Sequence, residues 1–590
     1  MKKVITLILI LALGSEFIMA QMLSTSYYEG EANTFQKGCM FATSHFPYIG
    51  RGYLEIKNNG SFSEWNNINV AKSGKYTIII KYSNASGYDK QCALTVNGRF
   101  IKNIPFKTAY KNWAYYYNAR VVVDLERGNN TIKLKANTVN GGPNIDNIAV
   151  SNNPISSPSG NLYNVKKFGA KGNGANNETA AIQAAINACS GTNGTVILDS
   201  GTFMCGHIEL KSNMTFWISE KAILKAIQDT SLYPASAQPN TNNISVADEL
   251  GISFIYSNKA NNLTITGGGT IDGNGNYSLW DGYKYDESVR PIPVYLTQGN
   301  NISFTNLDII HGAMWTLITL ECENVAIDGI NINSNLTENC DGIDICDSHN
   351  VTITNATIVC EDDAICPKSG NIIGVQNLIC KNITVNSTLN NYLKFGTKSY
   401  GHFKNILVED MVGNGGFTGI SIESVDGADI ENITIRRMKM NNVATPLYII
   451  HGAGLRSVTD QLFIPLGEPA KIGSVSNINI SDIECRNITS TVGSSILGTI
   501  RNGIVYRPTN ISLTNFNVQS FKGGITAPPK HPPEYSGGYP EYDNSGNLPA
   551  WGYYVRHAAN VTFTNCTHTV KTFDVRPAIQ FFDVKCVTDK

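Results

Sequence analysis

The pattern of apolar and polar positions changes between the first quarter of the chain and the rest. Residues 24–150 alternate short apolar runs with turns rich in Gly and Asn, as in GKYTIIIKYSN and ARVVVDLERGNNTIKLKA. Short alternating runs separated by such turns are typical of an antiparallel β-sandwich. The stretch SNNPISSPSGN then interrupts the pattern with Pro, Ser and Gly, the residues of a linker. We therefore expect a β-sandwich over residues 24–150 and a linker over residues 151–160.

From residue 161 onward one theme recurs, a pair of short Val/Ile/Thr strands bounded by Asn or Gly, as in SHNVTITNATIV. A repeat of 23 to 28 residues fits one coil of a parallel β-helix, whereas a propeller blade needs about 40 to 45 residues. We therefore predict a β-helix over residues 161–590, with these asparagines as turn residues rather than glycan sites. The asparagine before each first strand recurs at Asn301, Asn324, Asn350, Asn377, Asn405 and Asn432, in steps of 23, 26, 27, 28 and 27.

A short Ala-rich helix is predicted at residues 179–188, just before the coils. The open end of a β-helix exposes its core and its strand edges, so we expect this helix to cover the first coil.

The first 20 residues have the layout of a secretory signal peptide: two lysines, an apolar run from Val4 to Leu13, and the small residue Ala20. The run is too short to span a bilayer, and no later segment reaches 18 consecutive apolar residues. We therefore expect cleavage after residue 20, no membrane span, and a secreted or periplasmic protein. The alternative is an ordinary buried N-terminal strand.

Composition narrows the possible partners. The net charge is −1 and only 16% of residues are charged, which gives no reason to expect nucleic acid as a partner. The thirteen cysteines lack the paired C-x-x-C spacing of a zinc site, so we read them mostly as core thiols with one or two local disulfides at most. We expect a monomer.

Two acidic clusters interrupt this sparse charge, NCDGIDICDS at residues 339–348 and VCEDDAICPKSG at residues 359–370. Asp341 and Asp362 are 21 residues apart, close to one coil, so their side chains should lie one above the other, about 4.8 Å apart along the backbone. Repulsion between stacked carboxylates raises at least one pKa and keeps a proton available near neutral pH. One such group can protonate a glycosidic oxygen while another activates water. The alternative is that these acids bind Ca²⁺ or occupy turns.

These phrases, together with GGGTIDGNG, resemble family 28 glycoside hydrolases, the polygalacturonase and rhamnogalacturonase group, over about residues 161–437. The resemblance implies a right-handed parallel β-helix and an inverting hydrolase of pectin-type, galacturonic-acid-containing polysaccharide, with no catalytic cofactor. The family's N-T-D motif corresponds to residues 339–341 and its G-D-D motif to residues 361–363. Carried over by position, Asp362 is the general acid, and Asp341 and Asp363 act as the base.

The family's G-H-G and R-I-K motifs have no match in this chain. In polygalacturonases these basic residues hold the substrate carboxylate, but here the sequence reads NNYLKFGTKSYGHF and TGISIESVDG, with Ser421 and Glu423 at the Arg and Lys places. Arg436 from a neighbouring coil is one possible replacement, since a basic side chain pairs with a carboxylate. The candidate substrate-binding residues in this region are Lys394, Lys398, His402, Glu423 and His451.

The final segment, YPEYDNSGNLPAWGYYVRH, looks like the tail of a divergent bacterial branch of the same family and can fold back over the groove. We predict that Arg556 and His557 hold an acidic sugar there; the alternative is packing of the last coil.

The front module resembles family 35 carbohydrate-binding modules, and more loosely family 6, in the phrases YYEGEAN, GYLEI, LTVNG, LERGNNTIKLKA and GPNIDNIAV. The resemblance implies a structural Ca²⁺ held by Glu29, Glu31 and Asp146, whose hard oxygen ligands suit this ion. Trp113 and Asn144 are the candidates for sugar stacking and hydrogen bonding, with a core-filling role as the alternative for Trp113.

The predicted fold class is therefore all-β, an N-terminal β-sandwich of jelly-roll type followed by a right-handed parallel β-helix. The predicted function is hydrolysis of a pectin-type polysaccharide. Three alternatives remain open: a β-helical polysaccharide lyase, a hydrolase for a neutral or unusual sugar linkage, and a non-catalytic glycan-binding protein, the last favoured by the missing His, Arg and Lys.

Overall fold

The computed structural model describes residues 25–108, 112–152, 158, 160–234, 251–276, 289–387, 389–459, 464, 468–527, 529–544 and 546–589. The chain divides into two compact units between Ser157 and Pro158. We call them the N-terminal module (residues 25–152) and the β-helix (residues 160–589). The predicted signal peptide, residues 1–20, lies outside the described residues, as does most of the predicted linker.

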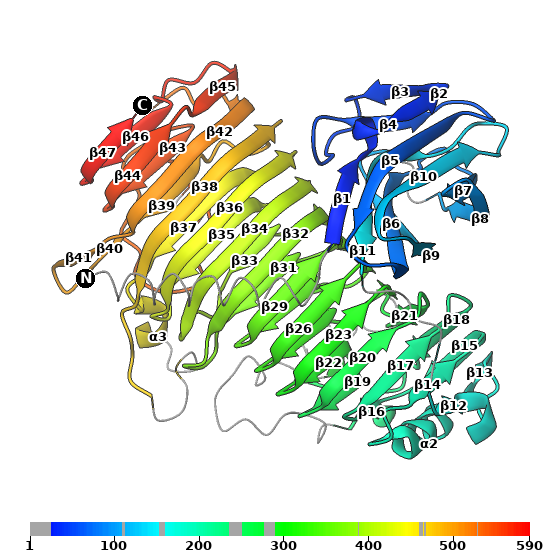
Figure 1. Cartoon of the computed structure of the whole chain (residues 1–590). Helices are drawn as coiled ribbons and strands as arrows, with labels where there is room; N and C mark the ends of the chain where they lie inside the picture. The colour runs from blue at the N-terminus through cyan, green and yellow to red at the C-terminus, as the bar shows by residue number, and fades with distance from the viewer. Residues whose placement is uncertain are drawn as a thin grey trace, which may run out of the picture. The chain divides into compact units, whose positions relative to one another are not determined.

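The N-terminal module is an antiparallel sandwich of two sheets (Figure 1). Trp65, Leu94 and Ile132 from one sheet and Ile80 and Ile148 from the other are fully or almost fully buried in one shared core. This confirms the predicted jelly-roll type sandwich. The first sheet contains β1 (Thr25–Glu29), β3 (Cys39–Ala42), β4 (Tyr53–Ile56), β6 (Gly74–Ser83), β9 (Tyr117–Leu125) and β11 (Asn144–Ser151), and the second β2 (Phe35–Lys37), β5 (Phe62–Val70), β7 (Lys90–Val96), β8 (Arg99–Phe106) and β10 (Gly128–Ala136).

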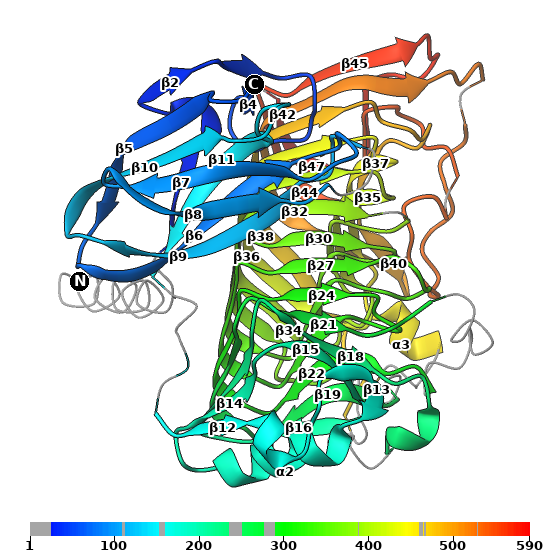
Figure 2. The same cartoon turned by 90° about the vertical axis from the view of Figure 1, so that its right-hand side faces the viewer.

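The second unit is a parallel β-helix built from a 22-stranded and a 12-stranded sheet (Figures 1 and 2). Successive coils stack on one another along the β-helix, so residues one repeat apart in sequence are neighbours in space. The 12-stranded sheet contains β16 (Ile208–Leu210), β19 (Ser253–Asn258), β22 (Ile292–Thr297), β25 (Leu317–Leu320), β28 (Ile343–Cys346), β31 (Ile365–Lys368), β33 (Leu393–Phe395), β35 (Thr418–Ser424), β37 (Thr445–His451), β39 (Ser494–Leu497), β43 (Tyr553–Arg556) and β46 (Ile579–Phe582).

The 22-stranded sheet bends within many of its coils, so that one coil often contributes two of its strands. Its strands are β12 (Leu162–Asn164), β13 (Asn173–Asn177), β14 (Thr195–Leu198), β15 (Gly201–Cys205), β17 (Met214–Ile218), β18 (Ala222–Ala226), β20 (Asn261–Thr266), β21 (Thr270–Asp272), β23 (Asn300–Thr305), β24 (Asp308–Ile310), β26 (Glu323–Asp328), β27 (Asn331–Ser334), β29 (His349–Thr354), β30 (Thr357–Cys360), β32 (Val375–Ser387), β34 (His402–Asn414), β36 (Asp429–Asn441), β38 (Ser474–Arg486), β42 (Thr509–Gly523), β44 (Ala559–Thr564), β45 (Thr567–Thr572) and β47 (Lys585–Asp589).

The recurring asparagines form a hydrogen-bonded ladder along the coils. Asn350 donates to Asn324 at 3.2 Å, Asn377 to Asn350 at 2.9 Å, and Asn405 to Asn377 at 3.3 Å. All four have a positive φ between 55° and 58°, a conformation that Asn tolerates better than most residues. The predicted role of these residues as turn asparagines is confirmed.

The predicted helix is present as α2 (Thr179–Cys189), which buries Ile182, Ala185, Ile186 and Cys189 beside the first coil. A short helix, α3 (Leu455–Thr459), and a hairpin of β40 (Thr499–Arg501) and β41 (Ile504–Tyr506) lie between later coils. All thirteen cysteines are free, and the ten that are buried are core thiols. None of the described helices has the length and apolar character to cross a membrane.

Candidate active site

Two neighbouring rungs of the 12-stranded sheet bring the acidic clusters together. In the pairing of β28 with β31, Ile343 lies opposite Ile365, an offset of 22 residues. The backbone N–H of Gly342 donates to the carbonyl of Asp363 at 2.8 Å, which continues this register toward Asp341. The residue in line with Asp341 is therefore Asp363, and not Asp362 as the 21-residue spacing predicts.

The three predicted catalytic carboxylates meet in space. One carboxylate oxygen each from Asp341, Asp362 and Asp363 lies within 4.8 Å of the other two. Asp341 and Asp363 are 2% and 4% exposed, while Asp362 is half-buried. The cluster therefore contains two buried carboxyl groups and one that is partly exposed.

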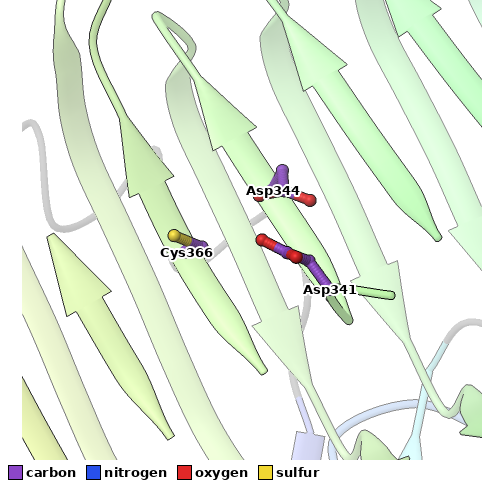
Figure 3. Close-up of side chains that lie close together, drawn as sticks. All are labelled: Asp341, Asp344 and Cys366. Carbon is purple, nitrogen blue, oxygen red and sulfur yellow. The ribbon is translucent and has the colours of Figure 1, made fainter. Parts of the chain in front are cut away.

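A buried lysine, Lys368, lies between two of the acids. Its Nζ is 2.9 Å from Asp341 Oδ2 and 2.6 Å from Asp344 Oδ1, and it lies over the Trp315 ring at 3.8 Å from the centroid. Figure 3 shows the Asp341 and Asp344 side chains close to each other and to Cys366. Because the ammonium already supplies the positive charge for both carboxylates, the geometry does not favour Ca²⁺ between them.

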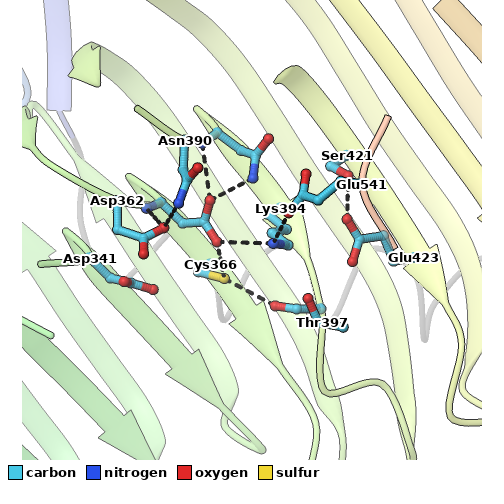
Figure 4. A network of polar contacts seen from close by, with 12 residues as sticks. Asp341, Asp362, Cys366, Asn390, Lys394, Thr397, Ser421, Glu423 and Glu541 are labelled. Atoms are coloured by element: carbon cyan, nitrogen blue, oxygen red, sulfur yellow. Dashed lines mark hydrogen bonds and ion pairs between the residues drawn. The ribbon is translucent and has the colours of Figure 1, made fainter. Parts of the chain in front are cut away.

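Asn390 and Asn391 stand where the G-H-G motif would lie, and each binds one of the paired acids. Figure 4 shows the contact of Asn390 with Asp362. Asn390 donates through its side chain to Asp362 Oδ1. Asn391 donates to Asp363 Oδ1 twice, from its side chain at 2.6 Å and from its backbone at 3.0 Å. The sequence reading missed both residues, although their place in the missing motif could have indicated them.

Lys394 forms an ion pair with one member of this acid pair, Asp363. Its Nζ lies 3.5 Å from Asp363 Oδ2, 3.4 Å from Glu541 Oε1 and 3.0 Å from the Tyr539 hydroxyl. Its side chain is 1% exposed. Lys394 was predicted as a substrate-binding residue; the structure places it among protein carboxylates, beneath the final segment of the chain.

These contacts separate the pKa values of the two consecutive acids. Burial, followed by the charges of Asp341 and Asp363, raises the pKa of Asp362 to about 8. Burial would also raise the pKa of Asp363, but the Lys394 and Lys368 ammonium groups and the Asn391 hydrogen bonds hold it below its usual value. Two acids with pKa values displaced in opposite directions are the arrangement that acid/base catalysis requires.

The pKa values of Asp341 and Asp344, the two acids that contact Lys368, are also raised. Burial raises the pKa of Asp344 to about 6, although Lys368 opposes this change. Burial raises the pKa of Asp341 as well, and the neighbouring Asp344 adds to this because one ammonium faces two carboxylates.

Glu423 lies close to the same network, from β35. Ser421 donates to its Oε1 at 2.6 Å, and its Oε2 is buried without a hydrogen-bond partner among the described residues. Burial raises the pKa of Glu423 to about 7, against the opposing charge of Lys394. The side chain is fully buried, so a substrate contact needs a displacement of the groups above it.

The remaining predicted basic residues have local partners. Burial lowers the pKa values of His402 and His451 to about 4, so both rings are neutral at pH 7 and a role as cations is not favoured. His402 lies beside His349 with ring centroids 6.2 Å apart, and His451 accepts a hydrogen bond from the Ala453 backbone. Lys398 is buried.

The side chains of Arg436, Arg556 and His557 contact other groups of the protein. Arg436 donates to Glu409 at 2.8 Å. Arg556 donates to the carbonyl of Pro532 at 2.6 Å, and His557 lies 3.1 Å from Glu534. Arg556 and His557 are 2% and 3% exposed, so the packing alternative describes them better than the predicted contact with an acidic sugar.

In the N-terminal module, the two predicted sugar-contact residues lie around one histidine. His45 stacks between Trp113, at 5.3 Å between centroids, and Tyr53, at 5.5 Å. Asn144 Nδ2 is 3.3 Å from His45 Nδ1. The half-buried Trp113 ring is therefore part of an aromatic stack with an amide beside it.

The three predicted calcium ligands surround one turn of this module. Asp146 accepts a hydrogen bond from the Ile49 backbone at 3.0 Å, and Glu31 accepts one from the Arg51 backbone at 2.9 Å. A Cβ added to Gly50, between them, would come within 2.9 Å of both Glu29 carboxylate oxygens. Oε2 of Glu31 is buried and has no hydrogen-bond partner in the described part of the chain, as expected of an oxygen that binds a cation.

Comparison with known proteins agrees with this geometry. The chain is 27% identical over 351 residues to a probable polygalacturonase of Arabidopsis thaliana, covering 56% of this chain and 72% of that protein. It is 25% identical over 351 residues to an exopolygalacturonase of Zea mays, covering 56% and 77%. The family 28 exopolygalacturonase of Yersinia enterocolitica shares the fold, at 16% identity and a TM-score of 0.57 over 94% of this chain and 98% of that one.

Family models match both units. Residues 26–152 match the carbohydrate binding module of family 35, and residues 236–530, half of the chain, match the glycosyl hydrolases of family 28. A match to a hydrolase family does not favour the lyase or the non-catalytic alternative. The chain therefore belongs to the glycosyl hydrolases of family 28, and it is a glycoside hydrolase with a family 35 carbohydrate-binding module at its N-terminus.

Proposed function

We propose that this protein hydrolyses galacturonic-acid-containing pectin chains with Asp362 as general acid and Asp363, assisted by Asp341, as general base. The observation that carries the proposal is the opposite displacement of the pKa values of Asp362 and Asp363 within one cluster. A proton remains on Asp362 at neutral pH, while Asp363 is ionised and able to accept one.

The reaction needs two proton transfers. Asp362 gives its proton to the glycosidic oxygen as the bond to the anomeric carbon breaks, and a water molecule that loses its proton to Asp363 forms the new bond. The amide groups of Asn390 and Asn391 fix the two carboxylates during these steps. The next cycle begins after Asp362 regains a proton and Asp363 loses one to solvent.

Inversion of the anomeric carbon is part of this proposal, on the strength of the family resemblance. The nearest oxygens of the acids lie within 4.8 Å. Inverting enzymes usually hold their two carboxyl groups roughly 6.5 to 9.5 Å apart and retaining enzymes about 5 to 5.5 Å. The anomer of the first product, followed by proton NMR, therefore decides between direct attack by water and a covalent intermediate.

The test is hydrolysis of polygalacturonate and of galacturonate oligomers, followed as new reducing ends, by the wild type and by Asp362→Asn. We expect activity in the wild type and a loss of about 10²- to 10⁴-fold in the variant, the usual contribution of a general acid. Unchanged activity in the variant would contradict the assignment of Asp362. Absence of cleavage by the wild type on every pectic substrate would contradict the proposed function.

The N-terminal module is proposed to bind the polysaccharide and to raise the substrate concentration at the β-helix. Trp113 and Asn144 are the proposed sugar contacts, because an aromatic face and an amide suit a hydroxylated ring. Glu29, Glu31 and Asp146 are proposed to hold a Ca²⁺ that fixes the turn around Gly50.

We also propose that the protein is exported and acts as a monomer. Export rests on the predicted signal peptide, and N-terminal sequencing of protein recovered from medium or periplasm tests it, with Gln21 expected as the first residue.

A further inference from the structure

One segment near the end of the chain reaches back to the acid cluster. We call residues 531–544 the strap; they lie beyond residues 236–530, which match the family model. Arg556 donates to the carbonyls of Pro532 and Pro533 at 2.6 and 3.1 Å and thereby holds the start of the strap. Tyr542, near its end, is buried in an apolar cluster with Val425, Tyr448 and Leu548. The strap is thus fixed on both sides of Tyr539 and Glu541.

Glu541 and Tyr539 both contact the ammonium of Lys394, at 3.4 Å and 3.0 Å. The Tyr539 ring also lies under this ammonium, 4.9 Å from Nζ to the centroid. The Lys394 side chain is 1% exposed and that of Glu541 is 20% exposed, so the ion pair is largely shielded from water. An ion pair in this environment interacts more strongly than one at the surface.

The same ammonium lies 3.5 Å from Asp363 Oδ2. Figure 4 shows Glu541 of the strap beside Lys394. Lys394 is therefore shared between an acid of the catalytic cluster and an acid of the strap. Because Asp363 and Glu541 attract the same ammonium at nearly equal distances, the strap affects how strongly Lys394 interacts with Asp363.

We propose that Glu541 is a positioning residue for the proposed reaction: it draws the Lys394 ammonium away from full contact with Asp363, so that the Asp363 carboxylate remains basic enough to accept a proton from water. The role rests on the proposed function of Asp363. Glu541 does not touch the reacting atoms in this account; it acts mainly through Lys394, beside a weaker direct repulsion of Asp363.

The charges around Asp363 fix the expected signs. The other groups that influence its pKa include the Lys368 ammonium and the Asn391 hydrogen bonds, and Asp341 and Asp362 adjoin it. Lys394 is faced in turn by Glu541, Glu423 and Tyr539. Removing the positive charge of Lys394 raises the pKa of Asp363, and removing the negative charge of Glu541 lowers it, because one carboxylate fewer then competes with Asp363 for Lys394.

The experiment compares Lys394→Met and Glu541→Gln in the full-length protein, with kcat/KM on galacturonate oligomers measured against pH. In this profile the fall of kcat/KM at acidic pH, the acid limb, reports the protonation of the general base. We expect this limb to move up by about 1 to 3 pH units in Lys394→Met and down by a smaller amount in Glu541→Gln. In the double variant, the downward shift due to Glu541→Gln should be much smaller than in the single variant, because Lys394 is absent and only the direct repulsion between Glu541 and Asp363 is left to remove.

The matched control is Glu431→Gln, which removes the acid of another Lys–Glu pair, that of Lys404 and Glu431 at 3.0 Å in the 22-stranded sheet. The control should leave the acid limb unchanged. Loss of packing alone would lower kcat in both test variants without opposite shifts. If the two limbs move in the same direction, or if neither moves, the positioning role is wrong.

A second measurement does not depend on turnover. Infrared spectra of protein with ¹³C-labelled aspartate, taken as differences against Asp363→Asn, follow the titration of the Asp363 carboxyl in each variant. The same opposite shifts are expected there. If the wild type cleaves no pectic substrate, the proposed function fails, and this titration still decides whether Glu541 controls Asp363 through Lys394.

Discussion

Asp362 and Asp363 are consecutive residues whose carboxyl groups are held by different partners. Asp362 Oδ1 accepts hydrogen bonds from the Asn390 amide and, at 2.8 Å, from the backbone of Asp363. Asp363 instead faces the Lys394 ammonium at 3.5 Å. Adjacent positions on one chain thereby acquire opposite protonation states at neutral pH.

The first prediction concerns the pH dependence of catalysis. The pKa of Asp362 is about 8 and that of Asp363 lies below its usual value. Because the acid must be protonated and the base ionised, kcat/KM should fall at alkaline pH with a limb near pH 8 and at acidic pH with a limb below about pH 4. Measurement of kcat/KM on galacturonate oligomers from pH 3 to 10 tests this, and an alkaline limb near pH 5 would show that another group is the acid.

The second prediction concerns the buried cation between Asp341 and Asp344. Lys368→Met removes the only ammonium within 3 Å of either carboxylate among the described residues and leaves two buried acids without a counter-ion. Breaking a buried pair in this way typically costs about 3 to 5 kcal/mol. Chemical unfolding at pH 7 should therefore show a loss of this size.

The pH dependence of that loss identifies its cause. Without Lys368 the folded-state pKa values of both acids rise above their wild-type values, whereas the unfolded state is the same in both proteins. The loss therefore grows as pH rises through the wild-type folded-state pKa, about 6 for Asp344, and shrinks as pH falls below it. Adding Asp344→Asn to Lys368→Met should recover part of the stability at pH 7. A loss that is equal at pH 3 and pH 7 would indicate lost packing on Trp315 rather than unpaired charge.

The coil repeat could be predicted from sequence because its cause is local. A turn with positive φ in every coil favours Asn, and the side-chain ladder along the β-helix repeats that choice at nearly constant spacing. The acid cluster could be predicted for the same reason, since its members lie one coil apart. The offset of 22 residues between Ile343 and Ile365 could not be predicted, because a loop that is longer by one residue leaves no signal in the apolar pattern of the strands.

The partners of the acids were harder to predict. Lys368 lies in the acidic cluster itself, but burial of its ammonium depends on Trp315, which precedes it by two coils. Glu541 follows Lys394 by 147 residues, and its contact depends on the path of the strap. Interactions made by a folded-back segment have no period in the sequence, so no pattern of strands or turns indicates them.

A third prediction follows from the asparagine ladder. Asn377 donates to Asn350 at 2.9 Å and accepts from Asn405 at 3.3 Å, with φ at 58°. Asn377→Ala loses both hydrogen bonds and adopts this φ unfavourably, at a cost of roughly 3 to 4 kcal/mol from about 1 kcal/mol per hydrogen bond and 1 to 2 kcal/mol for the conformation. Asn377→Gly loses the hydrogen bonds but not the conformation, so it should cost less. Equal unfolding free energies for the two variants would contradict the contribution of the backbone.

The last prediction concerns Ca²⁺ in the N-terminal module. Three acids, Glu29, Glu31 and Asp146, surround the turn from Ile49 to Arg51, and one oxygen of Glu31 is buried without a partner among the described residues. An ion bound at 100 times its Kd stabilises the folded module by about 2.7 kcal/mol. Calorimetry of the full-length protein should therefore show one unfolding transition whose Tm rises with added Ca²⁺ and falls with a chelator, whereas the Tm of the β-helix does not change.

Glu31→Gln separates this effect from general ion binding. The amide keeps a hydrogen-bond acceptor for the Arg51 backbone but removes the charge that holds the cation, so the Ca²⁺-dependent shift should be lost with little change in the chelated protein. Glu64→Gln, which removes the acid of a Lys133–Glu64 pair at 3.1 Å in the same module, is the matched control and should keep the shift. A shift that persists in Glu31→Gln would place the cation elsewhere, and a shift absent from the wild type would mean that the buried oxygen of Glu31 serves the turn without an ion.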